Sequence, residues 1–286
     1  VSGVDHPAPM TGGTRADSAD DARTVAPLRT LALDRLVSVA DHADFALAYA
    51  GIAKASATRL REGSREVVHL TVAAIDDAPL VPGDDLMGSL EQTLAAYGDP
   101  HLPVRVDVRR LLRLVLSAGL KVDADHLFDD VAARVRAGLL DSMGFRRAAL
   151  GRPVYLSRVI ASIQRTPGVD YVDVDTFGAL SDVADPVRLL TEVTGLGAVA
   201  GVVPVHLARS VRRDYFVGKG PVGEEDDTLS AIALRYGLSL AELVSLNPAL
   251  RDVALPDGSR VVVEDGICAA EVAYFDPKQP QSIVLR

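Results

Sequence analysis

The first regular pattern of apolar and polar positions follows a polar leader of about thirty residues. Apolar residues spaced by three and four predict a helix over 38–49, capped by Ser38 or Asp41, and a second helix over 84–98. Alternating runs over 52–60 and 66–73 predict a β-hairpin, and a further alternating run over 104–109 predicts a strand. The order is α-β-β-α-β.

A second unit follows directly. An apolar strand is predicted over 111–122, and a helix from Asp123 to Gly144, whose apolar stripe consists of Leu127, Val131, Val135 and Leu139. A shorter helix begins near Ser157 and ends at the Pro167-Gly168 turn, and a strand follows over 171–176. Helices on one face of a small, mainly antiparallel sheet give both units an α+β fold.

The rest of the chain divides by composition. Residues 180–213 show a short helix near 187–193 and a stretch rich in Gly, Ala and Val, whereas 215–263 follow a β-α-α-β pattern. The predicted parts are an extended arm (1–30), a first α+β unit (31–110), a second α+β unit (111–180), a connector (181–213), a compact module (214–264) and a C-terminal strand that returns to the body (265–286).

Composition narrows the function. The 286 residues carry 30 Lys and Arg against 39 Asp and Glu, a net charge of -9, which argues against binding nucleic acid or an anionic membrane through bulk charge. The one cysteine, Cys268, cannot form an internal disulfide, and no Cys/His grouping has zinc-ligand spacing. No apolar run reaches the length of a membrane span, and the start of the sequence does not resemble a signal peptide.

Residues able to carry out chemistry do not assemble into a recognisable catalytic motif. The sequence has no G-x-S-x-G elbow, phosphate-binding loop or H-E-x-x-H helix. Asp170, Asp173 and Asp175 alternate with valines and predict a solvated strand face, and His42 and His126 lie at helix starts among acids. We therefore expect no enzyme activity, no cofactor and no metal.

Four segments together resemble the baseplate J-like family of baseplate assembly proteins. They are PMTGGTRADS (9–18), RLVSVADHADFALAYAGIAKASA (35–57), REVVHLTVAA (65–74) and GRPVYLSRVIASIQRTPGVDYVDVD (151–175). The resemblance implies a structural wedge protein of a contractile phage tail or contractile injection system, linking hub or spike, sheath and fibre proteins in a six-fold ring. It also implies assembly in the cytoplasm and residence in a tail-like particle.

Three later segments resemble the LysM module: YFVGKG (215–220), DTLSAIALRYGLSLAELVSLNPAL (227–250) and LPDGSRVVV (255–263). The resemblance implies a βααβ fold and binding of N-acetylglucosamine polymers such as peptidoglycan. It assigns a glycan groove to Asp227, Thr228, Leu229, Asn247, Pro248, Asp257 and Gly258. The family usually has Gly directly before Asp-Thr-Leu, whereas PVGEED (221–226) intervenes here.

The same groove residues have a plainer interpretation. Asp227 or Thr228 can cap the following helix, and Asn247-Pro248 can end a helix by turn chemistry alone. The alternative to the baseplate function is therefore a cell-wall-binding protein that acts through its LysM-like module. A third possibility joins the two, with the module as a docking piece inside the baseplate.

Overall fold

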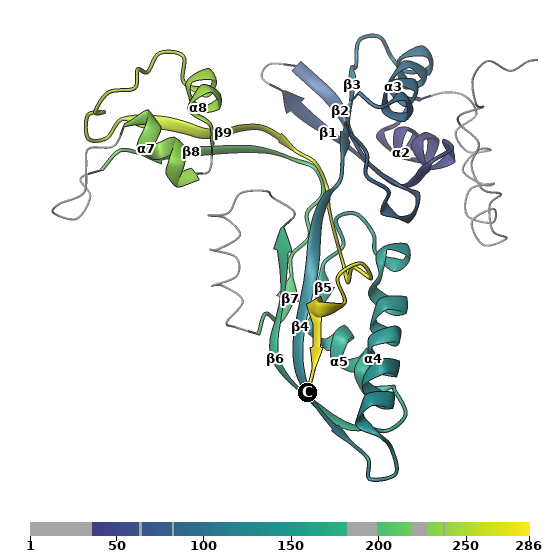
Figure 1. The fold of residues 1–286 in the computed structure, drawn as a ribbon. Coiled ribbons are helices and arrows are strands. Elements are labelled where there is room, and N and C mark those ends of the chain that lie inside the picture. Colours follow the sequence, from purple (N-terminus) through teal and green to yellow (C-terminus); the bar gives the residue numbers. More distant parts are fainter. Residues whose placement is uncertain (1–35, 63–64, 82, 182–198, 219–227, 237) are drawn as a thin grey trace, which may run out of the picture.

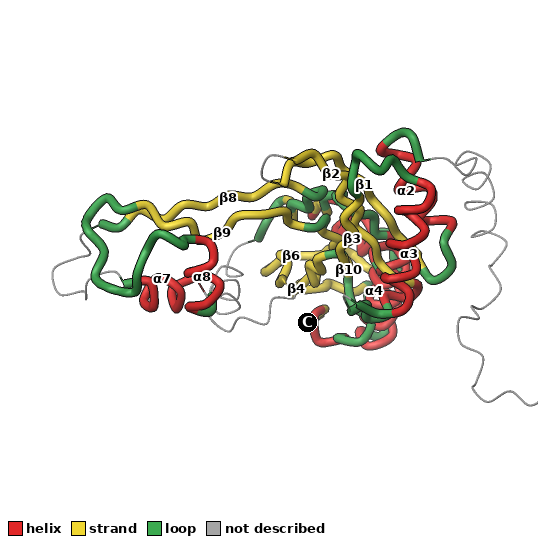
Figure 2. Tube along the Cα trace, turned by 90° about the horizontal axis from the view of Figure 1, so that it is seen from above, coloured by secondary structure: helices red, strands yellow, loops and turns green. Residues whose placement is uncertain are grey.

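The computed structural model describes residues 36–62, 65–81, 83–181, 199–218, 228–236 and 238–286. Two α+β units lie end to end, and a small module stands away from them on a long two-stranded ribbon (Figures 1 and 2). The predicted arm (1–30) and the predicted short helix near 187–193 lie outside the described residues.

The first unit has the predicted element order. Its elements are α2 (Val39–Ala48), β1 (Ile52–Glu62), β2 (Arg65–Ala74), α3 (Asp85–Tyr97) and β3 (Val104–Val108). The sheet order is β1-β2-β3, and β1 pairs antiparallel with β2 in the predicted hairpin. β3 pairs parallel with β2, because α3 crosses between these two strands and returns the chain to the same end of the sheet.

Local sequence explains how the helices of the first unit begin. Ser38 is the N-cap of α2, and its hydroxyl accepts the backbone N–H of Asp41 at 3.1 Å while the Asp41 carboxylate accepts the N–H of Ser38 at 2.7 Å. These hydrogen bonds hold the pKa of Asp41 below its usual value. Asp84 occupies the N-cap position of α3, but its carboxylate accepts the Val81 N–H instead of a helix N–H.

The second unit is built around one long strand. Its elements are β4 (Arg110–Val122), α4 (Phe128–Met143), β5 (Val154–Tyr155), α5 (Leu156–Gln164), β6 (Val169–Ser181), β7 (Val202–Val203), β10 (Glu271–Tyr274) and β11 (Ile283–Leu285). β6 pairs antiparallel with β4 on one side, and β10 and β11 pair parallel with β4 on the other. Residues from the C-terminal end of the chain thus complete this sheet.

Helices α4 and α5 supply the apolar layer that covers one face of the second sheet. The core of this unit includes Leu114, Leu116, Val135, Leu139, Ile163, Phe177 and Phe275. The predicted start of the helix at Asp123 is wrong, since α4 begins at Phe128 and Leu127 is 73% exposed. The chain turns first: His126 donates its N–H to the Asp123 carbonyl, and Asp123 donates its own to the Gly168 carbonyl.

The module has the predicted β-α-α-β order. Helices α7 (Leu229–Tyr236) and α8 (Leu240–Leu246) have the predicted bounds, and they pack on β8 (Arg209–Phe216) and β9 (Arg260–Cys268). Both strands are longer than predicted. Their charged halves, 209–213 and 264–268, pair with each other as a ribbon and do not pack against an apolar layer. In the described part of the chain no single helix could cross a membrane; α7 and α8 pass that test only as a pair, bent by 108°.

Candidate functional site

The start of α7 contains the first part of the predicted glycan groove. Asp227 lies outside the described residues. The Thr228 hydroxyl accepts the backbone N–H of Ala231 at 3.1 Å, so Thr228 caps the helix. Leu229 is fully buried in the core of the module. Thr228 and Leu229 therefore both stabilise the fold of the module.

A residue that the sequence did not indicate completes this cap. Asp252, in the loop after α8, accepts the backbone N–H of Ser230 at 2.9 Å and also its hydroxyl. The hydrogen bonds from Ser230 keep the pKa of Asp252 below its usual value. Twenty-two positions separate the two residues, so no local motif could have revealed the contact.

Asn247 pins the end of α8 to β9. Its side-chain amide donates to the carbonyls of Leu243 at 2.9 Å and Val262 at 2.7 Å, and its oxygen accepts the Val262 N–H at 2.8 Å. Asn247 is buried, and both of its side-chain donor hydrogens are used. A ligand at this end of the module would therefore have to contact exposed residues near Asn247.

Those exposed neighbours are Pro248, Asp257 and Gly258. Gly258 has a φ of 81°, a conformation that favours glycine, and its N–H donates to the Val217 carbonyl at 2.6 Å. The turn that carries Asp257 is thus held in place by Val217, the residue after β8, while the Asp257 side chain faces solvent. Of the seven predicted groove residues, these three are described and free to contact a ligand.

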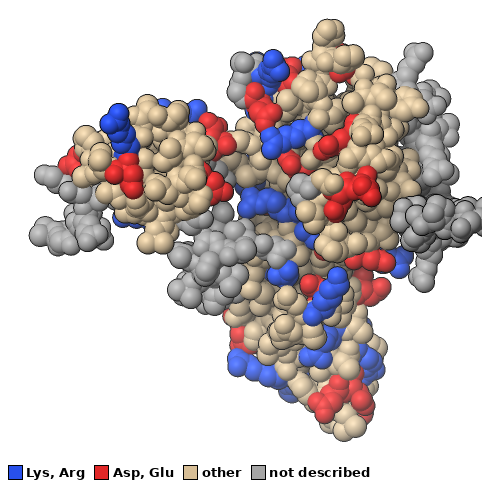
Figure 3. Space-filling view, turned by 45° about the horizontal axis from the view of Figure 1, so that its top comes forward, with Lys and Arg blue, Asp and Glu red and all other residues tan. Residues whose placement is uncertain are grey.

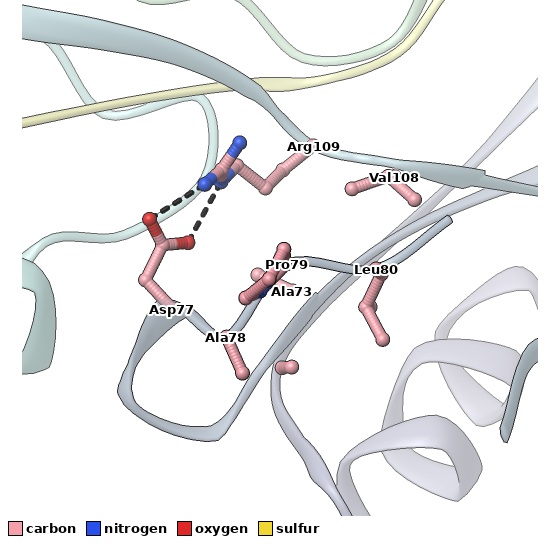
Figure 4. A pocket seen from close by; sticks show the side chains of 8 residues that line it. Ala73, Asp77, Ala78, Pro79, Leu80, Val108 and Arg109 are labelled. Atoms are coloured by element: carbon pink, nitrogen blue, oxygen red, sulfur yellow. Dashed lines mark hydrogen bonds and ion pairs between the residues drawn. The ribbon is translucent and has the colours of Figure 1, made fainter. Parts of the chain in front are cut away.

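A second candidate site is the joint between the two units, which we define as Lys54, Thr71, Asp77, Arg109, Ala270 and Tyr274. Asp77 has a φ of 53°, and its carboxylate pairs with both the Nε and Nη2 of Arg109, at 2.8 and 2.5 Å (Figure 4). The Tyr274 hydroxyl donates to the same carboxylate. Burial, and then the Asp77 carboxylate, raise the pKa of Tyr274 far above its usual value. The pair borders a hollow of about 200 Å³.

Two further members of the joint, Lys54 on β1 and Thr71 on β2, connect the first unit to the second. Lys54 donates to the carbonyl of Ala148 at 2.6 Å and lies over the Phe145 ring, and burial lowers its pKa. The Thr71 hydroxyl accepts the N–H of Ala270 at 2.9 Å. Sequence reasoning missed the joint. β2 is buried on both faces from Val67 onward, but one of those faces carries His69 and Thr71, so its sequence does not have the apolar pattern of a strand that is covered on both sides.

His69 and Asp107 form a part-buried pair across β2 and β3. The fully buried His69 ring lies 2.7 Å from a carboxylate oxygen of Asp107, and Arg105 lies 3.3 Å from the same oxygen. The hydrogen bond with His69, and then the charge of Arg105, lower the pKa of Asp107 from 3.8. The stabilisation by this carboxylate is thus present above about pH 3.8 and is lost as pH falls through the lower, folded-state value.

We expect the free energy of unfolding to decline on acidification below about pH 3.8, in part through Asp107. Asp107→Asn removes that part, so the slope of stability against pH below this value should become shallower. Tyrosine-monitored denaturation between pH 2.5 and about 6 measures both proteins. An unchanged slope in the variant would contradict this role of the pair.

Four other titratable residues that the sequence analysis considered lie on helices, strands or turns of the two units. His42 is buried and its Nδ1 lies 2.8 Å from the Ser38 carbonyl, and His126 is exposed beside Gly168. Asp170 pairs with Lys121, and Asp175 pairs with Arg286. Among the described residues, no group of three or more His, Cys, Asp or Glu side chains could hold a metal ion.

Comparisons with known proteins assign two parts of the chain. Residues 34–107 match the family model of the Baseplate J-like central domain, and residues 224–263 match the model of the LysM domain. Among solved structures, the chain is similar to one in "Cryo-EM structure of the anti-feeding prophage (AFP) baseplate, 6-fold symmetrised", with 14% identity and a TM-score of 0.40. That match covers 60% of this chain and 39% of the other, and no curated protein matches.

The two family matches coincide with two parts that are already distinct in the fold. The first covers the first unit from just before α2 almost to the end of β3, and the second covers both helices of the module and the start of β9. The chain therefore contains a Baseplate J-like central domain, formed by its first unit, and a LysM domain, carried at the end of the ribbon.

Proposed function

We propose that this chain is a structural wedge subunit in the baseplate of a contractile phage tail or contractile injection system. The observation that carries the proposal is the Baseplate J-like central domain over residues 34–107. In this function the chain links the hub or spike to sheath and fibre proteins and is present in a six-fold ring. It would reside in a tail-like particle, and its task requires no reaction.

The shape and surface of the molecule support a role in assembly. Two units joined end to end, with a module on a ribbon, present separate surfaces to several neighbours at once (Figure 1). Large apolar side chains are exposed on each part, including Tyr97, Tyr155 and Leu234. Figure 3 shows Lys and Arg interspersed with Asp and Glu on the face in view, which does not favour a nucleic-acid interface.

Quantitative mass spectrometry of purified particles tests the proposal. The chain should be recovered with sheathed particles in a copy number that is a multiple of six, relative to a subunit counted by microscopy. Recovery at fewer than one copy per particle, or only in fractions without particles, would rule out a ring subunit.

A second function, cell-wall binding, is favoured by one observation. The LysM domain stands at the end of the ribbon, and the turn bearing Asp257 and Gly258 is exposed there. Polymeric N-acetylglucosamine could reach this turn without contacting the rest of the body. The two functions are compatible in one chain, because the ribbon separates the parts that would perform them.

Under this second function, the full chain should be retained by insoluble peptidoglycan, and Asp257→Ala should weaken retention about tenfold through loss of one hydrogen bond to the sugar. Asp265→Ala, an exposed carboxylate on the ribbon, is the matched control and should bind normally. If the parent chain is not retained at all, the second function is wrong and the module acts by docking to protein. Equal retention of all three proteins would place any glycan contact away from this turn.

A further inference from the structure

One short segment of the chain touches both units and the base of the ribbon. It consists of Ala270 and strand β10, and it follows β9 of the ribbon after a single residue. We call residues 270–274 the strap. Every residue of the strap is buried.

At the base of the ribbon, Glu271 of the strap clamps the segment that leads into β8. One oxygen of its carboxylate accepts the backbone N–H of His206 at 2.9 Å and lies 2.8 Å from His206 Nδ1. The N–H of Glu271 donates to the His206 carbonyl at 2.8 Å. Arg209, the first residue of β8, lies 3.9 Å from the other carboxylate oxygen. The strap therefore connects the two strands of the ribbon at the end where they meet the two units.

At the other side, the strap is part of the joint. The Ala270 N–H donates to Thr71 of the first unit, and the Tyr274 hydroxyl donates to Asp77, which also binds Arg109. In the second unit, residues 271–274 pair with residues 110–113 of β4. Only about 10 Å of extended chain separates Glu271 from Tyr274. The strap has no slack that could absorb a movement at one of its ends.

We infer that the strap couples the position of the ribbon, and with it the LysM domain, to the joint at the base of the Baseplate J-like domain. A displacement of the ribbon that opens the Glu271 clamp shifts β10 and weakens the contacts of Thr71 and Asp77. Loosening of the joint weakens the clamp in return, because such coupling is reciprocal. This inference goes beyond the proposed function and does not depend on what the module binds.

Hydrogen exchange of the full chain, followed by mass spectrometry, tests the coupling in both directions. Glu271→Gln removes the charge of the clamp at nearly constant volume. It should speed exchange about tenfold at residues 204–211 and also at residues 71–78, which are the end of β2 and the turn after it. Tyr274→Phe removes the hydroxyl at the joint, and should speed exchange at 71–78 and also at 204–211.

Matched controls separate the strap from general destabilisation. Glu91→Gln on α3 and Tyr171→Phe on β6 alter exposed side chains of the same types and should leave both regions unchanged. Helix α4 contains none of the four substitutions, so it reports global unfolding and should exchange at the parent rate in all four variants. The inference is overturned if each strap variant affects only its own end, or if α4 accelerates as much as the two reporter regions.

Discussion

Replacing Asp77 by alanine should lower the free energy of unfolding of the two-unit body by about 3–5 kcal/mol, the cost of breaking a buried ion pair from one side. The Asp77 and Arg109 side chains are 11% and 14% exposed, so the Arg109 guanidinium has limited access to water that would replace the lost carboxylate. The Tyr274 hydroxyl would lose its acceptor in the same variant. Alanine is also disfavoured at the φ of 53° that Asp77 adopts.

Asp77→Asn is the matched control for the backbone. Asparagine tolerates a positive φ and keeps one oxygen as an acceptor for Arg109 and Tyr274, so its loss should be clearly smaller than that of alanine. Denaturant unfolding followed by tyrosine fluorescence suits a chain with no tryptophan. A loss below about 1 kcal/mol for Asp77→Ala, the level of an exposed pair, would show that the joint does not hold the units together.

Replacing Asn247 by alanine should destabilise the LysM domain by about 2–4 kcal/mol, because this buried side chain makes three hydrogen bonds and its loss leaves the Val262 N–H and carbonyl without their partner. Hydrogen exchange of the full chain can isolate this effect. Amides of α7 and α8 should exchange at least tenfold faster, while those of α4 should be unchanged.

Two further variants test that account of Asn247. Asn247→Asp can still accept the Val262 N–H but cannot donate to either carbonyl, so its effect should remain large. Ser245→Ala removes an exposed hydroxyl whose bond is local to α8 and should have little effect. Parent-like exchange in Asn247→Ala would mean that this residue does not support the fold and is available for a ligand.

Local periodicity predicted the elements well where the partner lies nearby in sequence. The hairpin of β1 and β2 and the bounds of α7 and α8 follow from alternation, caps and turns within a few residues. It could not predict the parallel pairing of β10 with β4, because each paired residue, such as Glu271 with Arg110, lies 161 positions from its partner and no local pattern links them. At Leu127, local periodicity predicted too much. The spacing of Leu127 fits the apolar stripe of α4, but the preceding turn leaves this residue outside the helix.

The candidate sites, too, could be predicted only where their contacts are local in sequence. Capping by Thr228 was one of two interpretations of the sequence, and the hydrogen bond to Ala231 supports it without testing glycan binding. The joint was missed because an aspartate in a turn, an arginine after a strand and a tyrosine near the C-terminus carry no shared motif. Only the three-dimensional arrangement brings these side chains together.

Electron microscopy of particles from cells with and without this gene tests the central claim most directly. Cells without the gene should yield no sheathed particles, or sheathed tubes that lack a baseplate, and the full chain supplied in trans should restore both. A chain lacking the ribbon and module (209–268), rejoined by a short linker, serves as a second complementing variant and shows whether the LysM domain is needed for assembly. Complete baseplates in the absence of the gene would contradict a structural role for this protein.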